Sequence, residues 1–452
     1  IHVTEDLRDR IMNSIAVLPF ANLSPDSQNE YLADGITEEI ISSLAKIGDL
    51  KVISRTSAFQ FKGQQVVGRE VGHRLGVAHF LEGSLRKVGE NLRVSAQLIR
   101  ASDDVLLWSK RFDRVMGDIF EIQDEIAGAI VDALSDSLAV SSDVLKQGEH
   151  NESVEAYQSY LLGLFHWNRR TEENTRLAIA AFNRALEVKP DYALAHAGLS
   201  LAYRLLFSQG YESTEEKIEL ALHHAQRALE LNEGVAEAHI SEAMIMREHE
   251  WDWARAEHHC LRALELKPGY ALAHGAYSEY LRCVGRFDEA LHARHRAIEL
   301  DPLNVNNYTS LCLLLFFMGD HKGGMRAAKE VLELDANFPF AHYFMGLFEL
   351  GMKKPERALK QFEREPTEWR RRYGTILALI KLGEQHRARK ELQRFISDYG
   401  DAGAYQIGAL HIQLGDLDSG FKWLNTSMAK QDGGIADAKY DPLMRTEQDD
   451  PR

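Results

Sequence analysis

The sequence is poor in cysteine and proline and contains no long apolar run. It has 3 cysteines and 10 prolines in 452 residues. Cys260, Cys283 and Cys312 form neither a CxxC pair nor a framework spacing, which favours small side chains packed in helix cores. A disulfide between neighbouring helices is the alternative. Without 18 consecutive apolar residues, no segment qualifies as a transmembrane helix, and the first residues lack a signal-peptide pattern.

A basic excess is also missing. The formal net charge of −15 argues against a nucleic-acid surface and weakly favours a neutral or basic partner. The chain contains no GxxxxGK[ST], GxGxxG, HExxH or GxSxG motif and no kinase loop. We therefore expect a non-catalytic chain without a cofactor or a metal. Because it begins with Ile1 rather than Met, we also expect a fragment whose effector domain lies upstream.

The second half of the chain repeats with a period of 34 residues. Gly285 and Gly319 are 34 residues apart, as are the Leu-Asp pairs that begin at 300 and 334. A period of this length indicates stacked supersecondary units rather than one closed core. In the unit 271–302, ALAHGAYSEYL predicts a first helix, Gly285 a tight turn, and LHARHRAIEL a second helix that ends before Pro302.

This pattern resembles the tetratricopeptide (TPR) repeat. The register gives about eight helical pairs over 157–430, regular in the middle and degenerate toward both ends. The resemblance implies a superhelical solenoid whose first helices line a concave groove for a protein or peptide partner. The implied groove residues are Leu313, Phe316, Phe317, Phe340, Tyr343, Leu347, Leu350, Tyr373, Leu377 and Ile380. The alternative is that they contact a neighbouring helix or the chain's own tail.

Histidines are frequent, 19 in all, and four of them share one position of the repeat. His196, His239, His274 and His342 share the fourth position of the first helix, where the side chain faces the second helix of its own repeat. We interpret them as packing residues, because a metal or pH-sensing ladder needs facing ligands that repeat spacing does not guarantee. The doublets, such as that at 223–224, are poor chelates because adjacent helical residues point about 100° apart.

The first 140 residues have a different pattern. Apolar runs at 14–20 and 50–54 predict strands, helical spacing follows 31–47, and two alternating runs joined by VGEN predict a hairpin before a third strand. A long amphipathic helix over 119–138 completes the order βαβαβββα, an α/β head domain ahead of the all-α array. The predicted organisation is a leader (1–13), a head (14–140), a linker (141–156), the array (157–430) and a tail (431–452).

The head closely resembles the TolB amino-terminal-like domain that is fused to TPR arrays in bacteria. The segments SIAVLPFANLSPDSQNEYLADGITEEIISSLAKI, LKVISRTSAFQFKG, LGVAHFLEGSLRKVGENLRVSAQLIRASDDVLLWSKRFDR and DIFEIQDEIAGAIVDAL carry the resemblance. It implies a regulatory module that follows an effector domain. A class III nucleotide cyclase, a CadC-type winged-helix domain or a Ser/Thr kinase is the effector in such proteins. We expect a cytoplasmic location, or the extracytoplasmic side of a membrane-tethered parent, and a homodimer as one assembly.

Three polar residues of the head invite a functional interpretation. Arg55 follows a strand between hydroxyl side chains and suits an anion, Asp34 with Gly35 suggests a bend in a helix, and Glu82 is a charge within a strand. The alternative is an internal ion pair, with Arg55 and Glu82 as the expected partners, or capping by Ser54 and Thr56.

Overall fold

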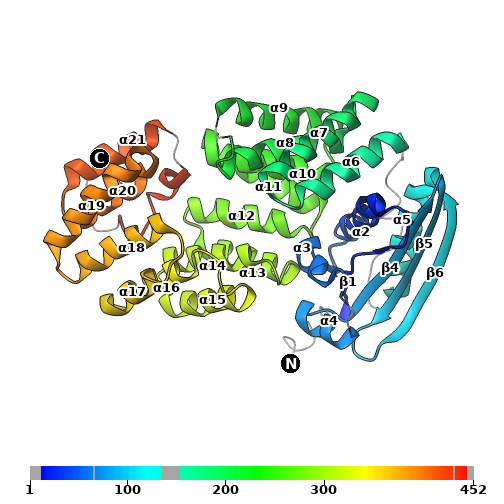
Figure 1. The fold of residues 1–452 in the computed structure, drawn as a ribbon, viewed down its shortest axis with the longest axis horizontal. Coiled ribbons are helices and arrows are strands. Elements are labelled where there is room, and N and C mark those ends of the chain that lie inside the picture. The colour runs from blue at the N-terminus through cyan, green and yellow to red at the C-terminus, as the bar shows by residue number, and fades with distance from the viewer. Residues whose placement is uncertain (1–11, 65–66, 135–152, 213, 431–432, 445–452) are drawn as a thin grey trace. The chain divides into compact units, whose positions relative to one another are not determined.

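The computed structural model describes residues 12–64, 67–134, 153–212, 214–430 and 433–444 (Figure 1). These residues form two compact units. The first unit comprises the chain up to Met246 with Ala254–Ala276 and Arg296–Leu303, and the second comprises Arg247–Trp253, Tyr277–His295 and the chain from Asn304 onward. The first unit therefore contains the α/β head together with the first repeats. The predicted leader and most of the predicted linker lie outside the described residues.

The head is built on one mixed sheet. Its strands are β1 (Ser14–Val17), β2 (Ala21–Asn22), β3 (Lys51–Val52), β4 (His79–Val88), β5 (Asn91–Arg100) and β6 (Val105–Val115). The order is β3-β1-β4-β5-β6, with β2 beside β4. β1 runs parallel to β3 and β4, whereas β4, β5 and β6 form an antiparallel meander. The predicted hairpin is confirmed: Val88 pairs with Asn91, and Gly89 supplies the positive φ of 59° that the turn needs.

Helices cover both faces of this sheet. The head helices are α2 (Glu30–Leu44), α3 (Arg55–Ala58), α4 (Gly68–Leu75) and α5 (Ile119–Leu134). Alternate residues of β1 point to opposite faces, so Ile15 joins the core that includes α2 and α5, and Ala16 joins the core that includes α4. Apart from the short β2 and the four-residue α3 that precedes α4, the order matches the predicted βαβαβββα, and the α/β class of the head is confirmed.

The described chain after residue 153 folds into helical pairs. The pairs are α6 (Val154–Trp167) with α7 (Glu172–Val188), α8 (Ala193–Ser208) with α9 (Glu215–Leu231), α10 (Ala236–Ile245) with α11 (Trp253–Leu266), α12 (Ala271–Cys283) with α13 (Phe287–Leu300), α14 (Val305–Met318) with α15 (His321–Leu334), α16 (Ala341–Gly351) with α17 (Pro355–Phe362), α18 (Glu368–Lys381) with α19 (Gln385–Tyr399), and α20 (Ala404–Gln413) with α21 (Leu417–Ala429). The predicted all-α TPR-type array is confirmed.

Glycine at two kinds of position makes the repeat possible. Gly285 and Gly319 occupy the turns within their pairs at φ of 80° and 75°, which side chains other than glycine rarely adopt. Gly163 and Gly198 instead lie inside α6 and α8, on either side of the Phe182 ring, where an added Cβ would come within 2.4 and 2.6 Å of that ring. The large ring of one helix therefore fills the space left by small residues on both neighbouring helices.

Candidate functional site

The groove residues lie on α14, α16 and α18 of the second unit, the first helices of three consecutive pairs. Leu313, Leu350, Phe340 and Tyr343 are half-buried. The others are buried: Phe316, Phe317, Leu347, Tyr373, Leu377 and Ile380. The ring of Tyr343 lies 6.3 Å from that of Tyr373, and Arg370 stacks on Phe340 at 3.4 Å. Most of this stripe thus packs one repeat against the next, as the alternative interpretation held.

A buried carboxylate fixes the most exposed part of the stripe. Glu365 is fully buried and accepts hydrogen bonds from the backbone nitrogens of Phe340 and Tyr343, both at 3.2 Å. Phe340 is the N-cap of α16 and has a φ of 83°. The carboxylate therefore satisfies amides that the start of a helix leaves without intrahelical partners. The short α17, which ends at Phe362, brings Glu365 back to this point.

The chain's own tail lies beside the groove residues. We call residues 433–444 the tail segment. The Tyr405 hydroxyl donates to Asp441 at 2.7 Å, and Gln413 Nε2 donates to the carbonyl of Leu443 at 2.5 Å. Burial raises the pKa of Tyr343, and the Asp441 carboxylate raises it further. The tail segment therefore passes close to the aromatic stripe, and Met444 joins the core around Tyr405.

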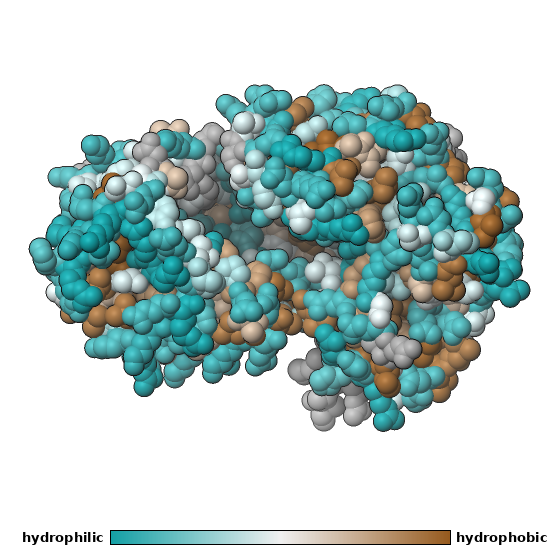
Figure 2. All heavy atoms as spheres, in the orientation of Figure 1, coloured by the Kyte–Doolittle hydropathy of each residue, from teal (hydrophilic) through white to brown (hydrophobic). Residues whose placement is uncertain are grey.

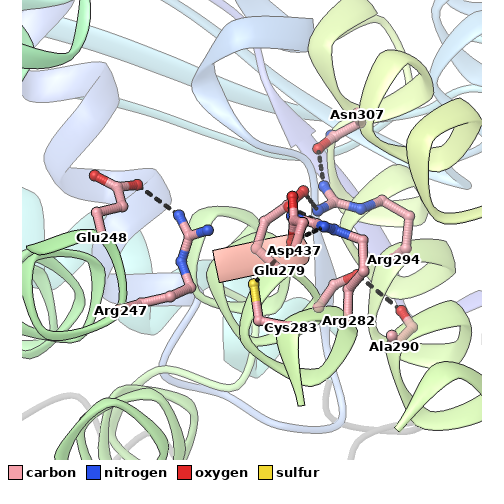
Figure 3. A network of polar contacts seen from close by, with 10 residues as sticks. Arg247, Glu248, Glu279, Arg282, Cys283, Ala290, Arg294, Asn307 and Asp437 are labelled. Carbon is pink, nitrogen blue, oxygen red and sulfur yellow. Dashed lines mark hydrogen bonds and ion pairs between the residues drawn. The ribbon is translucent and has the colours of Figure 1, made fainter. Parts of the chain in front are cut away.

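Three arginines lie around Glu279, and one of them, Arg282, contacts the tail segment (Figure 3). The arginine cluster consists of Arg247, Arg282 and Arg294. Glu279 lies between two of them, at 3.0 Å from Arg282 Nη2 and 2.6 Å from Arg294 Nη2, and Asp437 of the tail segment also pairs with Arg282. Burial alone would raise the pKa of Glu279, but the three guanidinium groups outweigh it and lower that pKa to about 2.

A cavity adjoins the arginine cluster. Its volume is about 390 Å³, and its walls include Trp251, Trp253, Cys283 and Tyr440. Cys283 is a free thiol whose sulfur lies 3.4 Å from an Asp437 oxygen. Burial raises the pKa of this thiol to about 11, so it remains protonated at neutral pH and donates to the carboxylate. Cys260 and Cys312 are likewise free and buried, so the structure gives no support to a disulfide among the three.

Of the three polar head residues, the structure brings Arg55 and Asp34 together but places Glu82 apart from them. Arg55 Nε lies 3.1 Å from Glu38, and Arg55 Nη2 lies 3.7 Å from Asp34. Glu82 is exposed on β4 and pairs across the sheet with Gln97, so the expected Arg55–Glu82 pair is wrong. The backbone path explains the error. Arg55 begins α3 and pairs with two acids of α2. Glu82 lies instead on β4, opposite Gln97 of β5.

Asp34 and Gly35 do not bend the helix that contains them. α2 is continuous from Glu30 to Leu44. A Cβ on Gly35 would meet the side chain of Leu161 at 2.8 Å, so this glycine lets α6 approach α2 closely. Asp34 instead accepts a hydrogen bond from Lys62 Nζ at 2.5 Å.

Helices α2 and α3 dock on the repeats of the first unit through buried polar groups. Asn168 donates to Glu38 at 3.0 Å, and Lys267 Nζ bridges Ser42 at 2.8 Å and Glu237 at 2.5 Å. Asp301 accepts from the hydroxyl of Ser57 at 2.6 Å. These polar contacts hold the head on the repeats. Arg55 and Asp34 pair with charges of the head itself, which favours their structural interpretation over an anion site.

The fourth-position histidines face the second helix of their own repeat, as predicted. His196 Nδ1 lies 2.9 Å from His224 Nδ1, and the same distance joins His239 to His259. Burial lowers the pKa of His224 to about 4. Burial also lowers the pKa of His196, so in the His196–His224 pair a neutral ring donates to a neutral partner. Among the described residues, no cluster of three or more metal-ligating side chains occurs.

The surface is mainly hydrophilic on the face that Figure 2 shows, with apolar side chains scattered over it. Of the larger exposed apolar residues, several lie along the sheet: Val88, Val105, Leu106 and Val115. β6 is the last strand in the order of the sheet. Among the described helices, none is long and apolar enough to cross a membrane.

Together these features define a class: an α/β head followed by a TPR-type array, with the head and the tail each packed on repeats of their own unit. Residues 11–129 match the family described as "HilA/YgeH-like transcriptional regulator, second domain". A Rhizobium meliloti (strain 1021) protein named "Putative adenylate cyclase 3" is 39% identical over 191 residues, which are 42% of this chain and 32% of that protein. The chain thus spans about a third of the length of that relative.

Solved TPR structures are distant from this chain. YrrB, a TPR protein with an unusual peptide-binding site, is 21% identical and covers 41% of this chain and 90% of its own, at a TM-score of 0.31. A Parabacteroides merdae TPR protein is 16% identical and covers 58% of this chain and 99% of its own, at a TM-score of 0.42. The human IFIT1 dimer with PPP-AAAA is 15% identical and covers 70% of this chain and 80% of its own, at a TM-score of 0.40. At such scores the fold rests on the repeat geometry described above, and the neighbours add no argument.

Proposed function

We propose that this chain is the non-catalytic regulatory and scaffolding part of a bacterial signalling protein. It binds a protein or peptide on the groove residues and couples that binding to an effector domain. The observation that carries the proposal is the continuous aromatic stripe over three repeats, of which Phe340 and Tyr343 remain half-exposed. Aromatic side chains that keep an accessible face are common anchors of peptide and protein partners.

The nature of the effector divides the proposal in two. The chain is the accessory half of a class III nucleotide cyclase, which the named cyclase relative supports, or the sensor half of a winged-helix regulator, which the HilA/YgeH-like match supports. The resemblance of residues 14–138 to a TolB amino-terminal-like domain agrees with both. The gene sequence upstream of Ile1 separates the two. A cyclase assay on this chain alone should give no turnover, and measurable turnover would contradict the non-catalytic assignment.

Capture experiments test the groove. The full chain with Phe340→Ala and Tyr343→Ala should retain at most a tenth of the captured partner, because the substitutions remove both half-exposed rings of the stripe. Leu177→Ala is the matched control, since that residue is 44% exposed on α7, far in sequence from the stripe. Melting curves should stay within a few degrees of the unchanged chain. Equal capture by both variants would assign the stripe to packing alone.

Assembly and location complete the proposal. β6 ends the sheet order and exposes Val105, Leu106 and Val115, a surface that suits pairing with a second copy. Light scattering should show a dimer that Leu106→Lys converts to a monomer, and an unchanged mass would move the interface elsewhere. We favour the cytoplasm over the extracytoplasmic side of a tethered parent, since three free thiols suit a reducing compartment. Fluorescent-protein and alkaline-phosphatase fusions distinguish the two.

A further inference from the structure

Three side chains of the tail segment contact helical pairs of the second unit. Asp437 pairs with Arg282 of α12, and three residues later Tyr440 reaches the turn between α12 and α13. The next residue, Asp441, accepts a hydrogen bond from Tyr405 of α20. One short stretch, D-A-K-Y-D, thus places a carboxylate and an aromatic ring on the α12–α13 pair and a second carboxylate on α20.

The first point of contact requires an anion. Arg282 and Arg294 are only 4% and 3% exposed, and Arg247 lies beside them. Without Asp437, Glu279 is the acid that Arg282 and Arg294 share. Loss of Asp437 leaves these two buried guanidinium groups with one carboxylate between them, so a segment that replaces the tail segment restores the charge balance by bringing a carboxylate to Arg282.

The second point of contact requires an aromatic ring. Gly285 takes a φ of 80°, and a Cβ there would lie 2.5 Å from the Tyr440 ring. The ring packs edge-on against Phe287 with centroids 5.7 Å apart, and its hydroxyl donates to the carbonyl of Val284 at 3.2 Å. The glycine that the turn needs therefore also leaves the space for this ring.

We infer that the tail segment is a tethered ligand of this surface, and that the surface selects a partner segment of the form D-x-x-Y-D. A protein that carries such a segment displaces the tail and takes over its contacts to Arg282, Gly285 and Tyr405. The inference rests on the proposed function and names the chemistry of the partner. Charge complementarity supports this occupant, because Arg282 of the arginine cluster pairs with Asp437 of the tail segment. A basic or purely apolar segment leaves Arg282 without its second carboxylate.

Peptide binding to the full chain tests the inference. The probe is a fluorescent peptide with the sequence of residues 433–444, GGIADAKYDPLM. A full chain with Asp437→Ala and Tyr440→Ala should bind it at least tenfold more tightly than the unchanged chain, whose own tail competes. Lys439→Ala is the matched control, because this exposed residue lies between the two contacts, and it should bind like the unchanged chain. Equal affinity for the unchanged and the tail-weakened chain would overturn the inference.

Two further arms test the selected chemistry. Adding Arg282→Ala to the tail-weakened chain should abolish the gain, and a peptide with Ala in place of the residue equivalent to Asp437 should bind at least tenfold more weakly. Undiminished binding in either arm would overturn the role of the carboxylate. Trp251 and Trp253 share the cavity wall with Tyr440, so tail release should also shift tryptophan emission.

A measurement on the unchanged chain does not depend on the folding of variants. Saturating unlabelled peptide should speed hydrogen exchange in residues 434–444 at least tenfold, and unchanged exchange would count against displacement. Failure of the inference remains distinct from failure of the proposed function. If Phe340→Ala with Tyr343→Ala abolishes partner capture but the peptide does not bind, the groove stands and the D-x-x-Y-D chemistry falls. If the peptide binds while the aromatic substitutions leave partner capture unchanged, the D-x-x-Y-D chemistry stands and the groove assignment falls.

Discussion

Arg282 and Asp437 form an ion pair although 155 residues separate them in the sequence, and their side chains are 5% and 18% exposed. The same guanidinium contacts Glu279, so one arginine of the array serves two carboxylates. This pair connects the tail segment to the repeat that contains Gly285.

Removal of Arg282 should destabilise the second unit more than removal of Asp437. Arg282→Ala leaves two carboxylates without this cation, and a loss of about 3–5 kcal/mol is expected for breaking a buried pair from one side. Asp437→Ala leaves Glu279 on the arginine and should cost less. Urea denaturation of both single variants and the double variant gives the coupling. Additive losses would show that the two residues do not stabilise each other.

Arg55 should matter for stability rather than for anion binding. Arg55→Ala leaves Asp34 and Glu38 without this cation in a largely buried site, for an expected loss of about 2–4 kcal/mol. Arg93→Ala, which removes an exposed pair with Asp113, should cost much less and serves as the control. Phosphate titration followed by calorimetry is the second readout. Saturable phosphate binding that vanishes in Arg55→Ala would restore the anion site.

The histidine pairs should make stability depend on acid. Burial lowers the pKa of His196, His224 and His239, and that of His224 falls to about 4. The unfolded state therefore binds more protons, so their contribution is fully present above pH ~6.5 and is lost as the pH falls toward 4, on the order of 1–2 kcal/mol for His224 at pH 5. His224→Gln should flatten the decline in unfolding free energy between pH 7 and 5. An undiminished decline in this variant would contradict a contribution from the His196–His224 pair.

The packing around Phe182 should not tolerate an added methyl group. Gly198→Ala places a Cβ 2.6 Å from this ring, and overpacking of a core typically costs about 1–3 kcal/mol. Phe182→Leu added to that variant should recover part of the loss. Gly128→Ala is the control, because nothing lies within 4 Å of its Cβ and alanine favours a helix by about 0.5–1 kcal/mol. Thermal melts compare the three variants, and a neutral Gly198→Ala would refute the close fit.

The sequence by itself determined the repeating helices and the order of the head. Three sequence patterns were enough: the 34-residue spacing of Gly285 and Gly319, the alternation in β4 and β5, and the histidine register. Such periodic patterns predict helices and strands because local structure depends mainly on nearby residues in the chain. It also identified the aromatic stripe, because first-helix positions recur with the repeat. Whether that stripe is buried or open was not readable, since this depends on which segments return to cover it.

Only the tertiary structure decided the pairings across long distances. Arg55 pairs with Glu38 and Asp34 rather than Glu82 because α2, not β4, passes beside the start of α3. Lys267 bridges to Ser42 because the head docks on the first repeats. Asp437 lies in a tail without periodicity, and no local pattern points it to Arg282. Charge pairing depends on distance in space, so the partner of Asp437 is determined only once the chain has folded.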